Sequence, residues 1–146
     1  MCATACSVAS IEVSVTYSAS LRIFDKSLDP DTVSKRLGLT PDESHRAGDP
    51  HLGQSGRRYA DFSVGMWSIR SLLHRSAAPD DHITGLLARL QNRGEALKEL
   101  SAQGYKMDLF LGVFGIEDGN HGFSIASETM KALGDLGIKL EIDAYG

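Results

Sequence analysis

Hydrophobic and polar residues alternate along residues 11–23. The odd positions are apolar or small, whereas the even positions from Glu12 to Arg22 are polar or charged. A period of two is typical of a β-strand that has one face against a core and the other face in water. This strand would be longer than the commonest strands, so we expect a bend near residues 18–20.

Three later segments also predict strands. Residues 59–69 return to an extended pattern, and Gly65 is expected to kink that strand. Residues 107–116 are apolar at both parities in their second half, which predicts a central strand covered on both faces. Hydrophobic and polar residues alternate again along residues 138–145, which predicts a half-exposed strand as the last element.

Capping residues mark three predicted helices between these strands. Asp29 and Pro30 begin the first helix and Gly38 ends it. Apolar residues keep three-and-four spacing over residues 80–104, which predicts one main packing helix capped by its first two acidic residues. A third helix is predicted from a serine cap to a final glycine, over residues 127–137.

The stretch between the first helix and the second strand has few apolar residues. Residues 40–43 have capping-box spacing, which favours one further helical turn. Residues 44–58 are rich in glycine and predict a long loop. A connection of this length in a compact domain is more often functional or mobile than accidental.

The amphipathic first and last strands limit the fold class. If each has one face in water, helices cannot cover both faces of the sheet as they do in a doubly wound protein. We therefore predict an α+β two-layer sandwich, in which a mixed sheet of about four strands has the helices on one face. Residues 1–10 precede every patterned segment and are predicted to form a flexible N-terminal tail, and residues 11–146 a single α+β domain.

The composition is that of an ordinary globular chain. The 146 residues are 42% hydrophobic and 23% charged, which excludes a disordered or coiled-coil chain. The longest basic runs are pairs, which argues against nucleic-acid binding. No segment approaches the ~20 apolar residues that cross a bilayer, and no secretory signal pattern is present, so we expect no membrane association and a cytoplasmic location.

The net charge of -4 is unevenly distributed. Up to Arg75 the chain has 9 basic and 8 acidic residues, and beyond Arg75 it has 6 and 11. An acidic surface speeds the encounter with a basic partner, but it also serves solubility alone. Cys2 and Cys6 precede the patterned segments and predict neither a disulfide framework nor a zinc site. No cofactor is expected.

Histidines in two polar segments are the candidate metal ligands. His45, His51, His121 and Asp118 would converge on a metal ion if both segments lay at the same edge of the sheet. The chain has no HExxH motif, and surface histidines on polar loops are the competing interpretation. Residues 118–122 also resemble an anion cradle, although Asn and Gly in succession more commonly form a turn.

No recognisable catalytic motif is present. The chain has no GxSxG elbow and no Cys/His signature for nucleophilic catalysis. Asp108, Glu141 and Asp143 fall at outward-facing strand positions, where solvated acids are expected. Trp67, the single tryptophan, is interpreted either as part of a small core cluster or as an exposed anchor for a partner.

Several short motifs follow one another in a fairly specific order. They are LRIFDKSLDPDTVSKRLG at residues 21–38, Pro41 through Arg46 with Gly48 and Asp49, Trp67-Ser68-Ile69, and GNHGFSI at residues 119–125. In this order the chain resembles a bacterial family, domain of unknown function 4279, over most of residues 15–145. The resemblance implies a small stand-alone cytoplasmic α/β domain, and it supplies no activity, cofactor or catalytic residue.

We expect a non-enzymatic protein that recognises another protein, in the manner of the small acidic immunity proteins that neutralise toxins. This expectation rests on the missing catalytic motif, the acidic second half and the polar segment 44–58. The alternative is a metal- or small-ligand-binding enzyme or sensor that uses both polar segments. The residues selected for ligand or partner binding are Arg46, Asp49, Trp67, Asp118, Asn120 and His121.

Overall fold

A computed structural model describes residues 15–116 and 121–145 of the chain. The strands are β1 (Thr16–Asp25), β2 (Glu43–His45), β3 (His51–Leu52), β4 (Arg58–Tyr59), β5 (Gly65–Arg70), β6 (Lys106–Phe114) and β7 (Lys139–Tyr145). The helices are α2 (Pro30–Leu37), α3 (Pro79–Arg89), α4 (Gly94–Ala102) and α5 (Ser127–Asp135).

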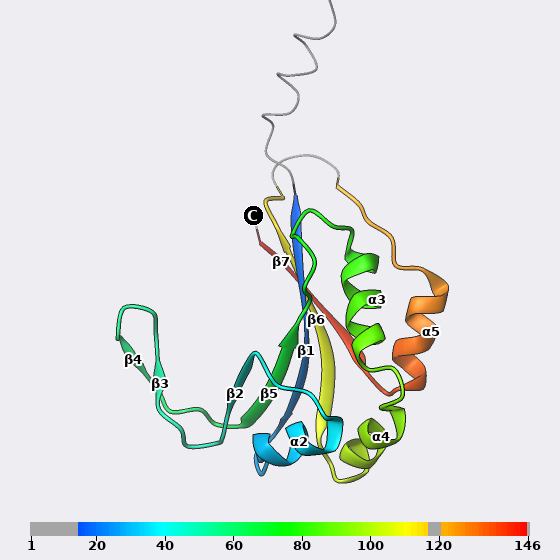
Figure 1. Ribbon diagram of the computed structural model, residues 1–146. Helices are drawn as coiled ribbons and strands as arrows, with labels where there is room; N and C mark the ends of the chain where they lie inside the picture. Colours follow the sequence, from blue (N-terminus) through cyan, green and yellow to red (C-terminus); the bar gives the residue numbers. More distant parts are fainter. Residues whose placement is uncertain (1–14, 117–120, 146) are drawn as a thin grey trace, which may run out of the picture.

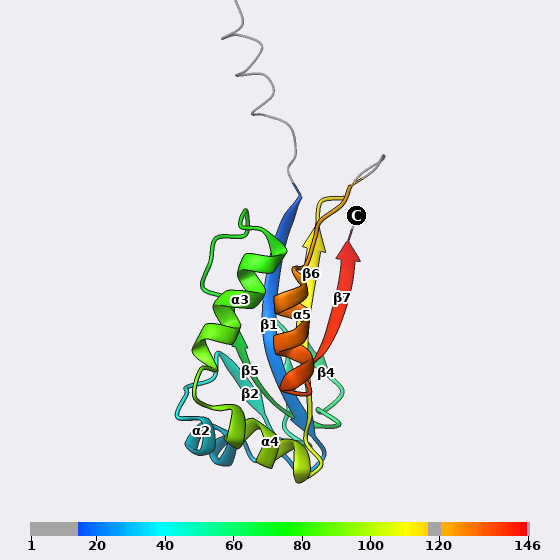
Figure 2. The same cartoon turned by 90° about the vertical axis from the view of Figure 1, so that its right-hand side faces the viewer.

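Five of the strands form one mixed sheet in the order β2-β5-β1-β6-β7, and β3 and β4 form a separate two-stranded ribbon. The helices lie on one face of the sheet, and the ribbon projects on the other side (Figure 1, Figure 2). This arrangement confirms the predicted α+β class with its mixed sheet. The main sheet has one strand more than expected, because β2 was predicted as part of a turn and a loop.

β1 is the central strand of the sheet. It pairs antiparallel with β5 on one side and with β6 on the other, and β7 pairs parallel with β6. The alternation correctly predicted a strand, because side chains such as Leu21 and Ile23 are fully buried in the core while their neighbours face away from the helices. The strand begins at Thr16, and residues 11–14 lie outside the described residues.

The first helix begins and ends where its capping residues predicted. Asp29 Oδ1 accepts a hydrogen bond from the backbone N–H of Asp31 at 3.1 Å, and Pro30 occupies the first turn. Gly38 follows the helix with a φ of 66°, a left-handed conformation that glycine adopts without strain. Local sequence is therefore sufficient to place α2.

The predicted helix over residues 80–104 is divided into α3 and α4. The break occurs at Asn92, whose φ of 66° is incompatible with a continuous helix. Both pieces still pack on the sheet through fully buried side chains, which include Ile83, Leu86, Leu97 and Leu100. The third helix is confirmed, although Ala126 rather than Ser127 is its N-cap.

Two predicted boundaries near the ribbon were wrong. Residues 40–43 form no helical turn, because the chain there runs beside β5 and enters β2 at Glu43. Residues 59–69 are not one strand, since β4 and β5 belong to different sheets. β5 begins at Gly65, where a Cβ atom would lie 2.8 Å from the backbone oxygen of Leu28.

The core lies between the sheet and the helices. Its largest side chain is that of Trp67, and His82 is the one ionisable ring among the largest fully buried side chains in the described residues. Within those same ranges, no helix combines the length and the apolar run that crossing a bilayer requires.

Candidate functional site

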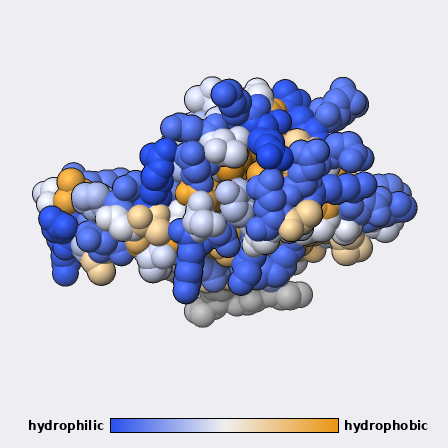
Figure 3. All heavy atoms as spheres, turned by 90° about the horizontal axis from the view of Figure 1, so that it is seen from below, coloured by the Kyte–Doolittle hydropathy of each residue, from blue (hydrophilic) through white to orange (hydrophobic). Residues whose placement is uncertain are grey.

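Residues 44–58, predicted as a loop, contribute β2 and the first half of a projecting hairpin, which we call the arm (residues 48–62). At its base, the Gly48 N–H donates to the Phe62 carbonyl oxygen at 2.7 Å, and the Phe62 N–H donates to the Asp49 carbonyl oxygen at 3.0 Å. The loop prediction holds for most of these residues but missed the short strands, because β3 and β4 have two residues each, too few to show alternation. The arm stands out from a largely hydrophilic body (Figure 3).

Stacked rings hold the arm against the edge of the sheet. The ring of Phe62 is stacked on both His45 of β2 and His51 of β3, with centroid distances of 3.4 and 4.2 Å. Across the hairpin, the His51 and Tyr59 centroids are 5.0 Å apart, and the Arg57 guanidinium lies 5.3 Å from the Tyr59 ring. A ribbon this short is marginal by strand pairing alone, so the ring contacts provide much of its order.

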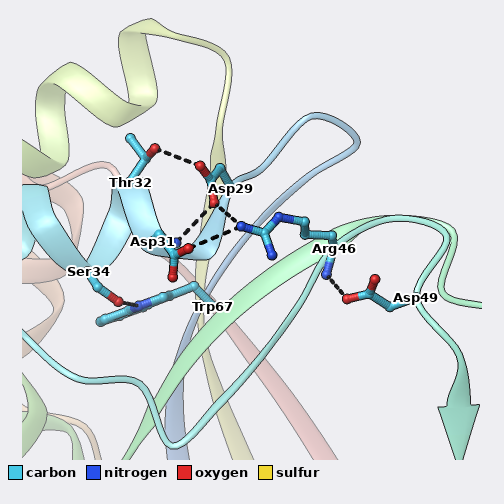
Figure 4. Close-up of polar contacts among 7 residues, drawn as sticks. All are labelled: Asp29, Asp31, Thr32, Ser34, Arg46, Asp49 and Trp67. Atoms are coloured by element: carbon cyan, nitrogen blue, oxygen red, sulfur yellow. Dashed lines mark hydrogen bonds and ion pairs between the residues drawn. The ribbon is translucent and has the colours of Figure 1, made fainter.

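Arg46 connects the base of the arm to the start of α2 (Figure 4). Its Nη2 donates to Asp29 Oδ1 at 2.7 Å and to Asp31 Oδ2 at 3.2 Å. Its backbone N–H donates to Asp49 Oδ2 at 2.8 Å. Arg46 and Asp49, both predicted to bind a ligand or partner, therefore fix the direction of the arm relative to the body.

Trp67 is a core residue, so its interpretation as an exposed anchor was wrong. The side chain is fully buried, and its Nε1 donates to Ser34 Oγ of α2 at 2.9 Å (Figure 4). Trp67 faces the helices because it lies opposite Ile23 of β1, and paired residues project to the same side of a sheet. The indole links β5 to α2 and contributes no surface for recognition.

A cavity of about 590 Å³ lies at the base of the arm. Its lining includes the imidazoles of His45 and His51, the Phe62 ring, and the acidic residues Glu43 and Asp49. Burial lowers the pKa of His45 in spite of the opposing effect of these two carboxylates, so the ring is neutral at pH 7. The cavity therefore offers aromatic surface together with negative charge.

The histidines predicted as metal ligands lie at opposite ends of β1. His45 is in register, through β5, with Phe24 of β1, and it shares the base of the arm with His51. His121 Nε2 instead lies 2.7 Å from the hydroxyl oxygen of Tyr17. Given the ~3.3 Å rise per strand residue, about 23 Å of β1 separates the two regions.

Two further predicted site residues, Asp118 and Asn120, lie outside the described residues. The same is true of most of the predicted anion cradle at residues 118–122. Among the residues that are described, no group of three or more His, Cys, Asp or Glu side chains is placed to hold a metal ion.

The sheet face without helices is a second polar surface beside the arm. Asp108 was expected to be solvated there, but it is buried because Arg22 of the neighbouring strand covers it. The Arg22 guanidinium also lies 4.6 Å from the centroid of the Phe110 ring. Glu141 and Asp143 are exposed, as expected.

Sequence reasoning missed the aromatic side chains that build the arm. Phe62 and Tyr59 were assigned to a single strand, and the histidines were considered only as metal ligands. One signal was available: residues 53–56, Gly-Gln-Ser-Gly, are a short glycine-bounded stretch typical of a hairpin connection.

No curated protein and no solved structure matches the chain. A family model described as a domain of unknown function (DUF4279) matches residues 15–146. The matched range includes every strand and helix given above, together with the arm. The match confirms the resemblance inferred from the order of the motifs, and the chain belongs to the DUF4279 family.

Proposed function

We propose that this protein recognises another protein, without catalysis, through the arm and the adjoining sheet face, in the manner of a small immunity protein. The observation that carries the proposal is an ordered arm whose apolar side chains are not used in the core. Leu52 of β3 is 63% exposed and Tyr59 of β4 is 45% exposed.

Ordering the arm costs conformational entropy, and the arm contributes nothing to the hydrophobic core in return. Fixing the backbone of one residue costs roughly 1–2 kcal/mol, and no residue of the arm belongs to the hydrophobic core. The stack on Phe62 and the contacts of Arg46 hold the arm in place while Leu52 remains in solvent. A hairpin ordered in this way is preorganised for contact with a partner, since less entropy is lost on binding.

The arm and the sheet face lie on the same side of the molecule, away from the helices (Figure 1). Together they present Leu52, Tyr59, Phe110 and the guanidinium groups of Arg22 and Arg57. Aromatic residues and arginine are enriched at protein interfaces. The acidic residues of α3, α4 and α5 lie on the other layer, whereas Glu141 and Asp143 of β7 lie near Arg22, so the proposed contact is apolar with charges of both signs.

Photocrosslinking tests this proposal without knowledge of the partner. p-Benzoylphenylalanine is placed at position 52 or 59 of the full chain in its native cell, and adducts formed on illumination are separated by mass. Position 130 is the matched control, because Met130 is 54% exposed but lies on α5 in the helical layer.

We expect one protein adduct of the same mass from positions 52 and 59 and no such adduct from position 130. The adduct at position 59 should disappear when Leu52→Asp is added, because a charged side chain there would have to be desolvated in an apolar contact. The absence of an arm-specific adduct, or an equal yield from position 130, would refute the proposal.

A further inference from the structure

A second cavity lies beside β1, where β5 ends. β5 pairs with β1 as far as Arg70, and the Ser71 N–H then donates to the Ala19 carbonyl oxygen at 2.8 Å. The chain next leaves β1 and returns at Arg75, whose carbonyl oxygen accepts from the Tyr17 N–H at 2.8 Å. The gap between these two contacts holds a cavity of about 440 Å³, a volume in the range of small-molecule sites.

The charged side chains that line this cavity are both cationic. Arg70 and Arg75 contribute guanidinium groups, His74 and His82 contribute imidazoles, and no acidic residue is among the lining residues. Arg70 Nη2 lies 3.4 Å from Glu43 Oε1, but both side chains are largely exposed and the ion pair is screened by water. Arg75 forms no ion pair with any residue that the structure describes, so its charge is available to a ligand.

The cavity also has a buried polar wall. His82 of α3 is 1% exposed, and its Nδ1 lies 2.7 Å from Ser71 Oγ. Its Nε2 is buried without a hydrogen-bond partner in the described residues. Fixing the Ser71 side chain against a buried ring gives the cavity a hydroxyl of defined position, in addition to the hydroxyls of Ser18 and Ser20.

Arg75 also borders a neighbouring cavity of about 300 Å³. The two cavities share Tyr17, Ser18 and Arg75, and the second one adds the ring of Phe114. Phe114 is 39% exposed and is stacked on Tyr145, with centroids 5.0 Å apart and an angle of 9° between the rings. The two adjoining cavities together, which we call the site, therefore combine cationic groups and hydroxyls with an aromatic surface.

We propose that this site binds a small molecule in which an oxyanion, a phosphate or a carboxylate, is joined to a flat apolar group. Arg75 and Arg70 hold the oxyanion, because a guanidinium donates two parallel hydrogen bonds to such oxygens. When the proton of the neutral His82 ring is on Nδ1, that N–H donates to Ser71 Oγ, and the Ser71 O–H is left to donate to the oxyanion from the buried side. The apolar group lies against Phe114. The site is separate from the arm, so the outcome of its test does not depend on the proposed protein recognition.

Nuclear magnetic resonance titration of the full chain tests the site. The probes are inorganic phosphate, phenyl phosphate, acetate and benzoate, at millimolar concentration and constant ionic strength. We expect the amide resonances of residues 71–75 to shift at the lowest probe concentrations. Phenyl phosphate should bind more tightly than inorganic phosphate, and benzoate more tightly than acetate. Comparison of the phosphate probes with the carboxylate probes identifies which oxyanion the site takes.

Arg75→Gln should weaken binding of the tightest probe by about tenfold or more, because it removes a charged hydrogen-bond donor. Arg36→Gln is the matched control, since it removes the same charge from α2, outside both cavities, and should leave the affinity unchanged. No saturable shift at residues 71–75 with any probe would overturn the proposal. Equal weakening by the two variants would also overturn it, because it would indicate attraction by net charge only.

Discussion

Arg22 and Asp108 form a two-point ion pair between β1 and β6 on the sheet face that has no helices. Arg22 Nε donates to Asp108 Oδ1 and Nη2 donates to Oδ2, both at 2.8 Å. The Asp108 side chain is 3% exposed, whereas that of Arg22 is 31% exposed. Within residues 15–116 and 121–145, Arg22 is the one cation in ion-pair contact with this carboxylate, and the contact raises the pKa of Arg22.

Replacement of Arg22 alone should therefore destabilise the protein strongly. We expect Arg22→Met to lower the free energy of unfolding by about 3 kcal/mol, because it leaves a buried carboxylate unpaired. The double variant Arg22→Met with Asp108→Leu should recover most of this loss, since no buried charge remains. Urea unfolding of each variant measures the change.

A matched control is Arg36→Gln, which breaks the exposed ion pair between Arg36 and Glu99. Such pairs contribute about 0–1 kcal/mol. If Arg22→Met costs no more than Arg36→Gln, the carboxylate of Asp108 does not depend on Arg22 in solution.

The single tryptophan provides a test of the contact between β5 and α2. Ser34→Ala leaves the buried indole N–H of Trp67 without an acceptor, so we expect a loss of about 1–3 kcal/mol in the free energy of unfolding. Native fluorescence should be protected from acrylamide, because the ring is fully buried. Ser27→Ala, at an exposed serine, is the control. Free access of acrylamide to the native protein would contradict the buried position.

Arg46→Ala should loosen the arm without unfolding the body. Its ion pairs with Asp29 and Asp31 are exposed and screened by water, so the global free energy of unfolding should change little. Hydrogen exchange at the amides of Gly48 and Phe62 should nevertheless become faster, because these bonds close the base of the arm. Arg58→Ala, which removes the pair with Asp61 within the arm, should leave the exchange at the base unchanged. Equal exchange in wild type and Arg46→Ala would exclude the positioning role of Arg46.

Sequence predicted those elements whose cause is local. The alternation in β1 reflects one buried face, and Asp29 and Gly38 cap α2 through their own backbone and side-chain geometry. The arm was missed because its order comes from rings brought together across sequence, such as His45 and Phe62. No local pattern reports a contact of that kind.

The same reasoning explains the errors at single site residues. The parity of Asp108 was predicted correctly, but its burial depends on an arginine from the neighbouring strand. Trp67 was ambiguous because the face that it occupies is set by its register with Ile23. Burial of a strand residue is decided by what the adjacent strand and helix place over it, and neither can be obtained from the segment alone.

Two histidines, His82 in the core and the half-buried His45, should make the protein less stable in mild acid. Burial is the largest influence on the pKa of both His82 and His45, and it lowers each pKa below its ordinary value of 6.5. Above about pH 6.5 both folded and unfolded chains carry neutral rings, so the full stability is present. As the pH falls below that value, the unfolded chain takes up protons that the folded chain does not, and the free energy of unfolding decreases.

We expect the free energy of unfolding, measured by urea at a series of pH values from neutral to mildly acidic, to fall less steeply for His82→Gln than for wild type. Adding His45→Gln should flatten the dependence of the unfolding free energy on pH further, because each replacement removes one ring that takes up protons more readily in the unfolded chain than in the folded chain. The sign of the change in slope distinguishes burial from charge pairing, because a histidine paired with a carboxylate would make the native state more stable as the pH falls. A steeper loss of stability in His82→Gln than in wild type would therefore show that a carboxylate partner, rather than burial, dominates at this ring.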